Sequence, residues 1–493
     1  MKSLVTLLLF FLNFMPVQAQ PDLPKDYLTK EFHKERREAL RASMPENSVA
    51  VFFANPIRNR ANDVDYVYHQ DPNFYYLTGY KEPDAVLVVF SENQIDGNGK
   101  TYNEILYVRK RDPKKEQWTG LRLGVEGAKT QLGFDMVFNG ESFLDSGIDY
   151  TKFDKVLFEP FKHDYRNFEK ENADLYDLIH SFIGQIQASS TIVETNVDHE
   201  NDIKSKTILS SNEVKVDNEL LSKLMAGLRQ IKTEEEMKLL VKAVRISTMG
   251  QREIMKAMHP GMSEAEIQGV HEFVYKKYGS EYEGYPSIVG AGNNGCVLHY
   301  VENNKTKVDN ELVLMDLGAE YHGYTADITR TIPANGKFTP EQKLIYDLVY
   351  KAQEAGIEAA VVGNTTKITD SICKDIVHQG LIDLGIAKEV KEAKKYFPHG
   401  TSHHIGLDVH DANLKGAFEP NMVITVEPGI YIPKGSPCDK KWWGIAVRIE
   451  DDVLITENGP VLLSNEAPRK SEEIEALMKE PSALDNFTLP KLD

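Results

Sequence analysis

Short apolar runs and amphipathic stretches alternate along the first part of this 493-residue chain. The runs NSVAVFFA (47–54) and DAVLVVF (84–90) have the length and composition of buried strands. FHKERREALRASM (32–44) places apolar side chains at helical spacing among charged ones, which predicts an amphipathic helix. The stretch 194–219 is polar and without clear periodicity, as is typical of a domain boundary. We therefore predict a first, α/β domain over residues 24–220.

Helix-start signals mark the second part of the chain. Three pairs of residues have the spacing of a capping box, in which two side chains cap the backbone N–H groups of a first helical turn: Thr233 with Glu236, Ser263 with Glu266, and Thr339 with Gln342. Strand-like runs follow at ELVLMDLGAEY, TADITRTI, MVITVEPGIYI and GIAVRIEDDVLIT. We predict an α+β domain of helices and antiparallel hairpins over residues 221–478, followed by a C-terminal tail at 479–493.

The N-terminus resembles a secretory signal peptide over residues 1–19. MKSLVTLLLFFLNFMPVQAQ has one basic residue, an apolar run from Leu4 to about Phe14, and an A-x-A-like VQA before Gln20. The apolar run is too short for a comfortable membrane span, although an uncleaved anchor is the alternative. We expect an exported protein, periplasmic or secreted, with no membrane span after signal cleavage.

Charge and cysteine content narrow the class of protein. The net charge of −18 argues against a nucleic-acid partner, which needs a basic footprint. The three cysteines, Cys296, Cys373 and Cys438, are too few and too widely spaced for a disulfide framework or a CxxC zinc site.

Two pairs of acidic residues interrupt the strand-like runs of the second part. Asp316 and Asp327 are symmetric about the Tyr321/His322 junction, so a hairpin turning there, near Gly323, would place them directly opposite each other. Carboxylates that close repel unless a cation lies between them. Glu427 and Glu450 each end an apolar run. Taken singly, these residues could equally be exposed strand or turn residues.

A cluster of histidines adds to these acids. HGTSHHIGLDVHD (399–411) holds four histidines in thirteen positions, and histidine is the commonest metal ligand in proteins. Four carboxylates and one imidazole suit two divalent metal ions, with Mn²⁺ favoured by the oxygen-rich set and Co²⁺, Fe²⁺ or Zn²⁺ possible. Two such ions can hold a bridging hydroxide and polarise a carbonyl, which indicates metal-assisted hydrolysis.

Five motifs, in order, resemble those of the pita-bread metallopeptidases and, within them, the aminopeptidase P family: IVGAGNNGCVLHYVEN, LMDLGAEYHGYTADITRT, HGTSHHIGLDVHD, TVEPGIYI and VRIEDD. RANDVDYVYHQDPNFYYLTGYKEPDAVLVV likewise resembles the family's amino-terminal domain. The resemblance covers nearly the whole mature chain. It implies an α+β protein in which a creatinase-like N-terminal α/β domain precedes a pita-bread catalytic domain.

The resemblance also implies roles for individual residues. The metal ligands would be Asp316, Asp327, His403, Glu427 and Glu450, with Asp327 and Glu450 bridging the two ions and Glu427 also acting as general base. His299 and His410 would contact the substrate or the tetrahedral intermediate, and His399 and Arg448 would line the substrate site. Trp118 would reach the active site of a neighbouring subunit, which favours a homodimer or homotetramer.

The implied reaction is removal of an N-terminal residue that precedes proline, and the implied partners are peptides with proline at the second position. Prolidase, which takes only Xaa-Pro dipeptides, is the nearest alternative, but Ser402 is more typical of aminopeptidase P. A non-catalytic pita-bread binding domain is a remote alternative, because such domains lose the ligands. We expect His299 on an apolar strand, His404 in packing, and Asp408 and Asp411 in structural roles.

Overall fold

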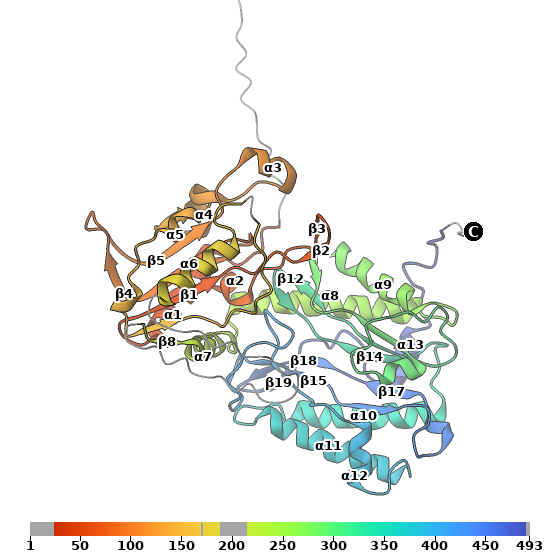
Figure 1. The fold of residues 1–493 in the computed structure, drawn as a ribbon. Coiled ribbons are helices and arrows are strands. Elements are labelled where there is room, and N and C mark those ends of the chain that lie inside the picture. Colours follow the sequence, from red (N-terminus) through yellow and green to blue (C-terminus); the bar gives the residue numbers. More distant parts are fainter. Residues whose placement is uncertain (1–23, 169–170, 188–213, 490–493) are drawn as a thin grey trace, which may run out of the picture.

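The computed structural model describes residues 24–168, 171–187 and 214–489, so the predicted signal peptide and most of the predicted boundary stretch lie outside the described residues. Two parts lie side by side (Figure 1): an N-terminal part around one sheet, and a larger C-terminal part in which helices enclose several short sheets. Among the described residues, no helix is long and apolar enough to cross a membrane.

The N-terminal part is built on a six-stranded mixed sheet in the order β6-β5-β4-β1-β7-β8. Its strands are β1 (Ser48–Phe53), β4 (Val86–Ile95), β5 (Thr101–Val108), β6 (Val137–Asn139), β7 (Lys155–Leu157) and β8 (Val216–Asp217). Strand β4 runs antiparallel to β1 and β5, whereas β6 runs parallel to β5. The hairpin β2 (Asn59–Ala61) and β3 (Val64–Asp65) stands apart from this sheet.

Both faces of this sheet are apolar, and each is covered by a helix. The helices of this part are α1 (Lys30–Ser43), α2 (Pro72–Thr78), α3 (Pro113–Thr119), α4 (Gly124–Leu132), α5 (Glu141–Leu144) and α6 (Leu175–Gln187). Alternate residues of β1 point to opposite faces, so Ala50 joins the cluster that contains Leu40 of α1, and Val51 joins the cluster that contains Phe182 of α6. The two predicted strands and the predicted amphipathic helix are confirmed.

The C-terminal part places short antiparallel sheets between two layers of helices (Figure 1). Its helices are α7 (Asn218–Arg229), α8 (Glu234–Ala257), α9 (Glu264–Lys277), α10 (Pro340–Glu358), α11 (Thr366–Asp383), α12 (Val390–Ala393) and α13 (Ser471–Leu477). Its strands are β9 (Tyr282–Glu283), β10 (Ile288–Ala291), β11 (Leu312–Asp316), β12 (Ala319–Tyr321), β13 (Tyr324–Thr325), β14 (Thr329–Pro333), β15 (Val423–Val426), β16 (Gly429–Ile432), β17 (Ile445–Arg448), β18 (Asp451–Thr456) and β19 (Gly459–Leu462). One apolar cluster takes side chains from α8 and α9, from the strands, and from α10 and α11.

The three predicted capping boxes open α8, α9 and α10. In each, the N-cap hydroxyl accepts the backbone N–H three residues on, and the side chain at that position accepts the N-cap N–H. Pro340 occupies the first turn of α10, where its missing N–H costs nothing. These helix starts are therefore confirmed, and they fix the helical layers that enclose the sheets.

The predicted register of the central hairpin is wrong by two residues. Asp316 pairs with Thr329, and Tyr321 pairs with Tyr324 across a two-residue turn. The turn residues His322 and Gly323 have φ values of 51° and 91°, the two positive angles that a type I′ turn requires. The hairpin therefore turns between His322 and Gly323 instead of one residue earlier. A shift of two residues keeps each side chain on the same face of the ladder.

The expectation that His299 lies on a strand is also wrong. It lies in an exposed turn after the 3₁₀ helix η2 (Gly292–Cys296). Gly290 and Gly295 approach each other so closely that a Cβ atom at Gly290 would lie 2.7 Å from the Gly295 Cα. This contact lets the chain fold back in a tight turn after β10, where a strand was expected.

Candidate metal centre

Five side chains of the types that bind metal ions come together, most of them from strand ends, in the C-terminal part. Asp316 ends β11, Glu427 follows β15, and Glu450 lies between β17 and β18. Asp327 lies in the short gap before β14, and His403 precedes the bridge between His404 and Ile424. Ligand atoms of Asp327, His403 and Glu450 all lie within 4.8 Å of one another. The sequence elements that carry these residues are far apart, and the antiparallel pairings bring them to one place.

The imidazole of His403 is oriented for a ligand at Nε2. Its Nδ1 lies 3.1 Å from the backbone oxygen of His404, where it donates its proton. Nε2 then carries the lone pair, and it lies 3.4 Å from Asp327 Oδ2, 3.6 Å from Glu427 Oε1 and 4.0 Å from Glu450 Oε1. The nitrogen and the carboxylates therefore face a common point.

The carboxylates of this group repel one another. Burial raises the pKa of Asp327, Glu427 and Glu450 well above the ordinary values, and the neighbouring carboxylates raise it further. An arrangement of buried acids around one unprotonated imidazole nitrogen is unfavourable unless cations neutralise it. The donor set thus fits divalent cations, and its oxygen-rich composition fits hard or borderline ions.

Tyr285 is part of this group, and the sequence interpretation missed it. Its hydroxyl lies 2.7 Å from Asp316 Oδ1 and 2.6 Å from Asp327 Oδ1, so one phenol holds both aspartates in place. It lies in the GYPS segment between β9 and β10, where no local pattern distinguishes it from an ordinary packing tyrosine. The nearby carboxylates and burial raise its pKa well above the ordinary value, so the phenol stays protonated.

Arg448 lies buried at the edge of the carboxylates. Its Nη2 donates to Asp316 Oδ2 at 2.5 Å, its Nε donates to Thr329 Oγ1 at 3.1 Å, and its Nη1 donates to Tyr431 Oη at 3.1 Å. Thr329 Oγ1 in turn donates to Glu450 Oε2 at 2.6 Å. Burial opposes the charge on Arg448, but the surrounding acidic groups raise its pKa well above the usual value. The guanidinium therefore stays charged and orients the acids.

His399 continues the network that begins at Arg448. Its Nε2 lies 2.8 Å from Tyr431 Oη and accepts that proton, while Nδ1 lies 2.7 Å from the backbone oxygen of Gly400 and donates to it. Nδ1 is also 3.5 Å from Glu427 Oε2. Burial and the charge of Arg448 lower the pKa of His399 to about 4, so the ring is neutral at neutral pH.

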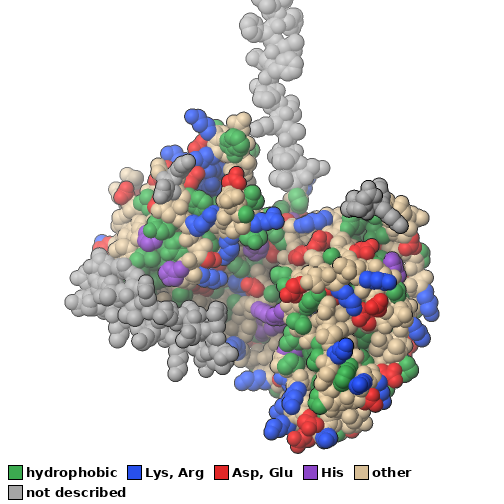
Figure 2. All heavy atoms as spheres, turned by 45° about the vertical axis from the view of Figure 1, so that its right-hand side comes forward, with side chains coloured by type: hydrophobic (Ala, Val, Ile, Leu, Met, Phe, Trp, Pro, Cys, Tyr) green, Lys and Arg blue, Asp and Glu red, His purple; other side chains and the backbone are tan. Residues whose placement is uncertain are grey.

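The other two histidines assigned to the substrate site are exposed. The His410 ring centroid lies 4.4 Å from that of His403, at an interplanar angle of 83°. Partial burial and the nearby His403 lower the pKa of His410, which favours the neutral ring. The neighbouring His299 also lowers the pKa of His410. Figure 2 shows histidine side chains in the hollow between the two parts of the molecule.

The remaining residues of the histidine segment are packed away from the carboxylates. His404 is buried, and its Nδ1 has no hydrogen-bond partner among the described residues. Asp411 is buried between the cations of Arg229 and Lys232, and Arg229 also donates to Asn73 Oδ1 at 2.8 Å. Asn73 belongs to α2, so this ion-pair group joins the N-terminal part to the segment that carries His403.

Trp118 lies outside this group. It is 88% exposed on α3 at the far end of the N-terminal part, and Leu121 beside it is 80% exposed. Within one chain, the structure therefore does not bring Trp118 to the metal centre.

Comparison with known proteins agrees with this architecture. Residues 238–457 match the family model described as metallopeptidase family M24, and residues 33–151 match the model of the aminopeptidase P N-terminal domain. The two matches fall on the C-terminal and N-terminal parts. The chain belongs to the aminopeptidase P members of metallopeptidase family M24.

Relatives resemble the chain over almost its whole length. The Xaa-Pro aminopeptidase of Haemophilus influenzae is 36% identical over 467 residues, which cover 92% of this chain and 98% of the relative. The Xaa-Pro aminopeptidase of Escherichia coli is 34% identical over 471 residues, with the same coverage of 92% and 98%. The solved structure of aminopeptidase P from E. coli with the inhibitor Pro-Leu matches with a TM-score of 0.77 at 33% identity and covers 92% of this chain and 98% of that chain. These matches confirm the predicted fold class: a creatinase-like N-terminal domain followed by a pita-bread domain.

Proposed function

We propose that the chain hydrolyses the Xaa-Pro bond at the N-terminus of peptides and releases the first residue. The observation that carries this proposal is the convergence of Asp327, His403 and Glu450 with two further acids in a chain of this metallopeptidase family. Full-length relatives are Xaa-Pro aminopeptidases, and they support the specificity for proline. Proline needs a specialised enzyme, because it has no N–H to donate and its ring fixes φ.

The proposed cofactors are two divalent metal ions, with Mn²⁺ as the preferred ion. They would be held by the five converging side chains Asp316, Asp327, His403, Glu427 and Glu450. When bound, such ions supply Lewis-acid activation of water and of the scissile carbonyl. The carboxylate-rich donor set supports Mn²⁺, and one imidazole also suits Co²⁺, Fe²⁺ or Zn²⁺.

The residues of the chain have separable tasks in this proposal. Glu427, which the family resemblance implies as general base, takes the proton of the attacking water; its Oε1 lies 3.6 Å from the His403 Nε2, within the group of proposed ligands. His299 and His410, both exposed, donate N–H groups to the substrate or to the tetrahedral intermediate.

His399 lines the substrate site in this proposal. Its ring is held by Tyr431, which Arg448 orients in turn. Since Arg448 also binds Asp316, one guanidinium positions both an acid and the substrate-facing histidine.

Export and self-association belong to the same proposal. The signal-peptide pattern of residues 1–19 supports an exported protein, periplasmic or secreted. The exposed Trp118 and Leu121 support a homodimer or homotetramer, because large apolar side chains so exposed are typical of contact surfaces.

The test compares a tripeptide Xaa-Pro-Yaa with the dipeptide Xaa-Pro. The purified chain is stripped of metal with a chelator and assayed before and after addition of Mn²⁺, Co²⁺, Fe²⁺ or Zn²⁺. We expect cleavage of the tripeptide only after metal is restored. Cleavage confined to the dipeptide would make the chain a prolidase, and no cleavage with any ion would indicate a binding domain.

A further inference from the structure

A polar cavity of about 240 Å³ opens in the N-terminal part, away from the metal centre. It lies at the carboxyl ends of the parallel strands β5 and β6, where Arg109 and Gly140 follow the two strands, and the residues before α6 close its other side. Crevices at the carboxyl ends of parallel strands are the usual ligand sites of α/β sheets. None of the metal-centre residues lines this cavity.

Five cationic side chains line the cavity, and four of them have carboxylate partners. The pairs are Arg109 with Asp84 at 3.4 Å, Lys110 with Glu141 at 3.4 Å, Arg111 with Glu116 at 2.5 Å, and Lys115 with Glu171 at 2.5 Å. Asp112 accepts backbone N–H groups at the start of α3, and Asp174 accepts the backbone N–H of Asp177 in the first turn of α6 and that of Phe168. Each acid of the cavity wall therefore has an ion-pair or hydrogen-bond partner.

Arg122 is the fifth cation and has no such partner. It is only 8% exposed, and among the described residues it forms no ion pair. Its Nη1 donates to the backbone oxygen of Lys110 at 3.1 Å, but its buried Nε has no hydrogen-bond partner in the described part of the chain. Arginine is almost never buried without a partner, because an unpaired buried charge is costly.

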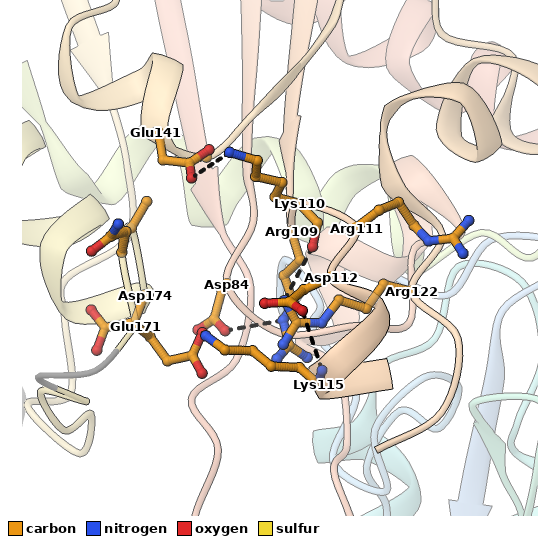
Figure 3. A pocket seen from close by; sticks show the side chains of 13 residues that line it. Asp84, Arg109, Lys110, Arg111, Asp112, Lys115, Arg122, Glu141, Glu171 and Asp174 are labelled. Atoms are coloured by element: carbon orange, nitrogen blue, oxygen red, sulfur yellow. Dashed lines mark hydrogen bonds and ion pairs between the residues drawn. The ribbon is translucent and has the colours of Figure 1, made fainter. Parts of the chain in front are cut away.

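The side chain of Arg122 points into the cavity. Figure 3 shows it directed toward Arg109 and Asp112, whereas Arg111 points away from the group. Figure 2 shows Lys and Arg side chains gathered over this end of the N-terminal part. The cavity thus presents a guanidinium without an ion-pair partner among the described residues to a space that solvent can enter, with Asp112 as its nearby counter-charge.

The backbone around the cavity adopts two unusual conformations. Asp84 and Ala173 have φ values of 56° and 57°, in the left-handed region that favours glycine. Asp84 Oδ1 accepts the N–H of Leu175 at 3.0 Å, at the start of α6. Strained residues of this kind cluster at ligand sites, where the surrounding structure holds them in place.

We propose that this cavity is an anion site that binds a small oxyanion, with Arg122 as its charge partner. A phosphate or a carboxylate group offers the acceptors that Arg122 lacks, and a guanidinium fork matches both. The volume suits a compact ion, since sites for drug-sized ligands measure about 300–1,000 Å³. Bound anion links Arg122 to the loop of α3 and so stabilises the segment that carries Trp118.

The experiment is calorimetric titration of the full chain with inorganic phosphate and, separately, with acetate, at fixed ionic strength. We expect saturable binding of at least one anion to one site, weakened about tenfold or more in Arg122→Gln, because a hydrogen bond to a charged group is lost. Arg245→Gln, which removes the same charge at an exposed ion pair on α8, should bind as the parent does. Preference for phosphate or acetate identifies the group that the site recognises.

A second variant tests the proposal in case Arg122→Gln does not fold. Asn172 is exposed on the cavity wall, so Asn172→Glu adds a competing carboxylate without disturbing a core. We expect Asn172→Glu to weaken anion binding to a similar extent. The proposal is overturned if neither anion binds saturably, or if binding is equal in the parent and in whichever of Arg122→Gln and Asn172→Glu is folded. Equal binding would place the anion elsewhere, including at the metal centre.

Discussion

Arg448 and Asp316 form a buried ion pair, with Nη2 of the arginine 2.5 Å from Oδ2 of the aspartate. Because Asp316 is one of the proposed ligands, the Arg448 guanidinium fixes the position of a carboxylate that would bind a metal ion. The same guanidinium also holds Tyr431, and through it His399.

Arg448→Lys should lower kcat/KM by about tenfold to a hundredfold, because a lysine cannot hold Asp316, Thr329 and Tyr431 at once. Steady-state kinetics with a saturating metal supply measures this loss. Arg469→Lys, at a partly buried ion pair with Glu354, is the matched control and should keep its activity. Equal rates for the parent and Arg448→Lys would remove the positioning role.

Tyr285→Phe should weaken metal binding by about tenfold to a hundredfold, since the phenol orients both Asp316 and Asp327. Metal titration of the stripped protein measures the affinity. Tyr278→Phe, at an exposed position at the end of α9, should bind metal as the parent does. Unchanged affinity in Tyr285→Phe would mean that the aspartates hold their positions without the phenol.

Asp411→Asn should lower the free energy of unfolding by about 3–5 kcal/mol, because it removes the ion-pair partner that the buried Arg229 and Lys232 share. Denaturant unfolding measures the change. Asp145→Asn, on the surface, should stay within about 0.5 kcal/mol of the parent. A small effect at Asp411 would show that the ion-pair group does not join the two parts.

The contribution of Asp411 should also depend on pH. Burial opposes its ionisation, but Arg229 and Lys232 outweigh burial and hold the pKa of Asp411 below the ordinary value of 3.8. A carboxyl with a lowered pKa in the folded state stabilises fully above its unfolded pKa, and this stabilisation is lost as the pH falls through the folded pKa. The difference between parent and Asp411→Asn should therefore be constant near neutral pH and shrink below about pH 4. A difference that grows on acidification contradicts this assignment.

Trp118→Ala should shift the chain toward a smaller assembly, because a buried large apolar side chain contributes about 1.5–3 kcal/mol to a contact. Sedimentation at several protein concentrations measures the distribution of species. Phe487→Ala, which removes a similarly exposed aromatic ring near the C-terminus, is the control. Identical distributions for all three proteins would place the contact surface away from α3.

Local signals in the sequence predicted local structure well. Capping boxes at Thr233, Ser263 and Thr339 depend on residues three positions apart, and each begins a helix in the structure. The proposed ligands could be named because five motifs in order resemble a known family. The structure brings these residues together, and their roles stay predictions.

Long-range geometry was harder to predict. The hairpin register follows from the two positive φ angles at His322 and Gly323, and a histidine there gives little sign of a type I′ turn. His299 was expected on a strand because its neighbours are apolar, yet a close contact between two glycines turns the chain. Tyr285 touches the aspartates only through tertiary packing, which no periodic pattern records.

The most direct test of the central claim is mass spectrometry of the products from one Xaa-Pro-Yaa peptide, with the metal-reconstituted parent and with Glu427→Gln. The parent should release free Xaa and Pro-Yaa, and Glu427→Gln should be slower by about a hundredfold or more, because it loses the proposed general base. Release of Xaa-Pro, an intact peptide with every metal, or undiminished turnover by Glu427→Gln would contradict the account.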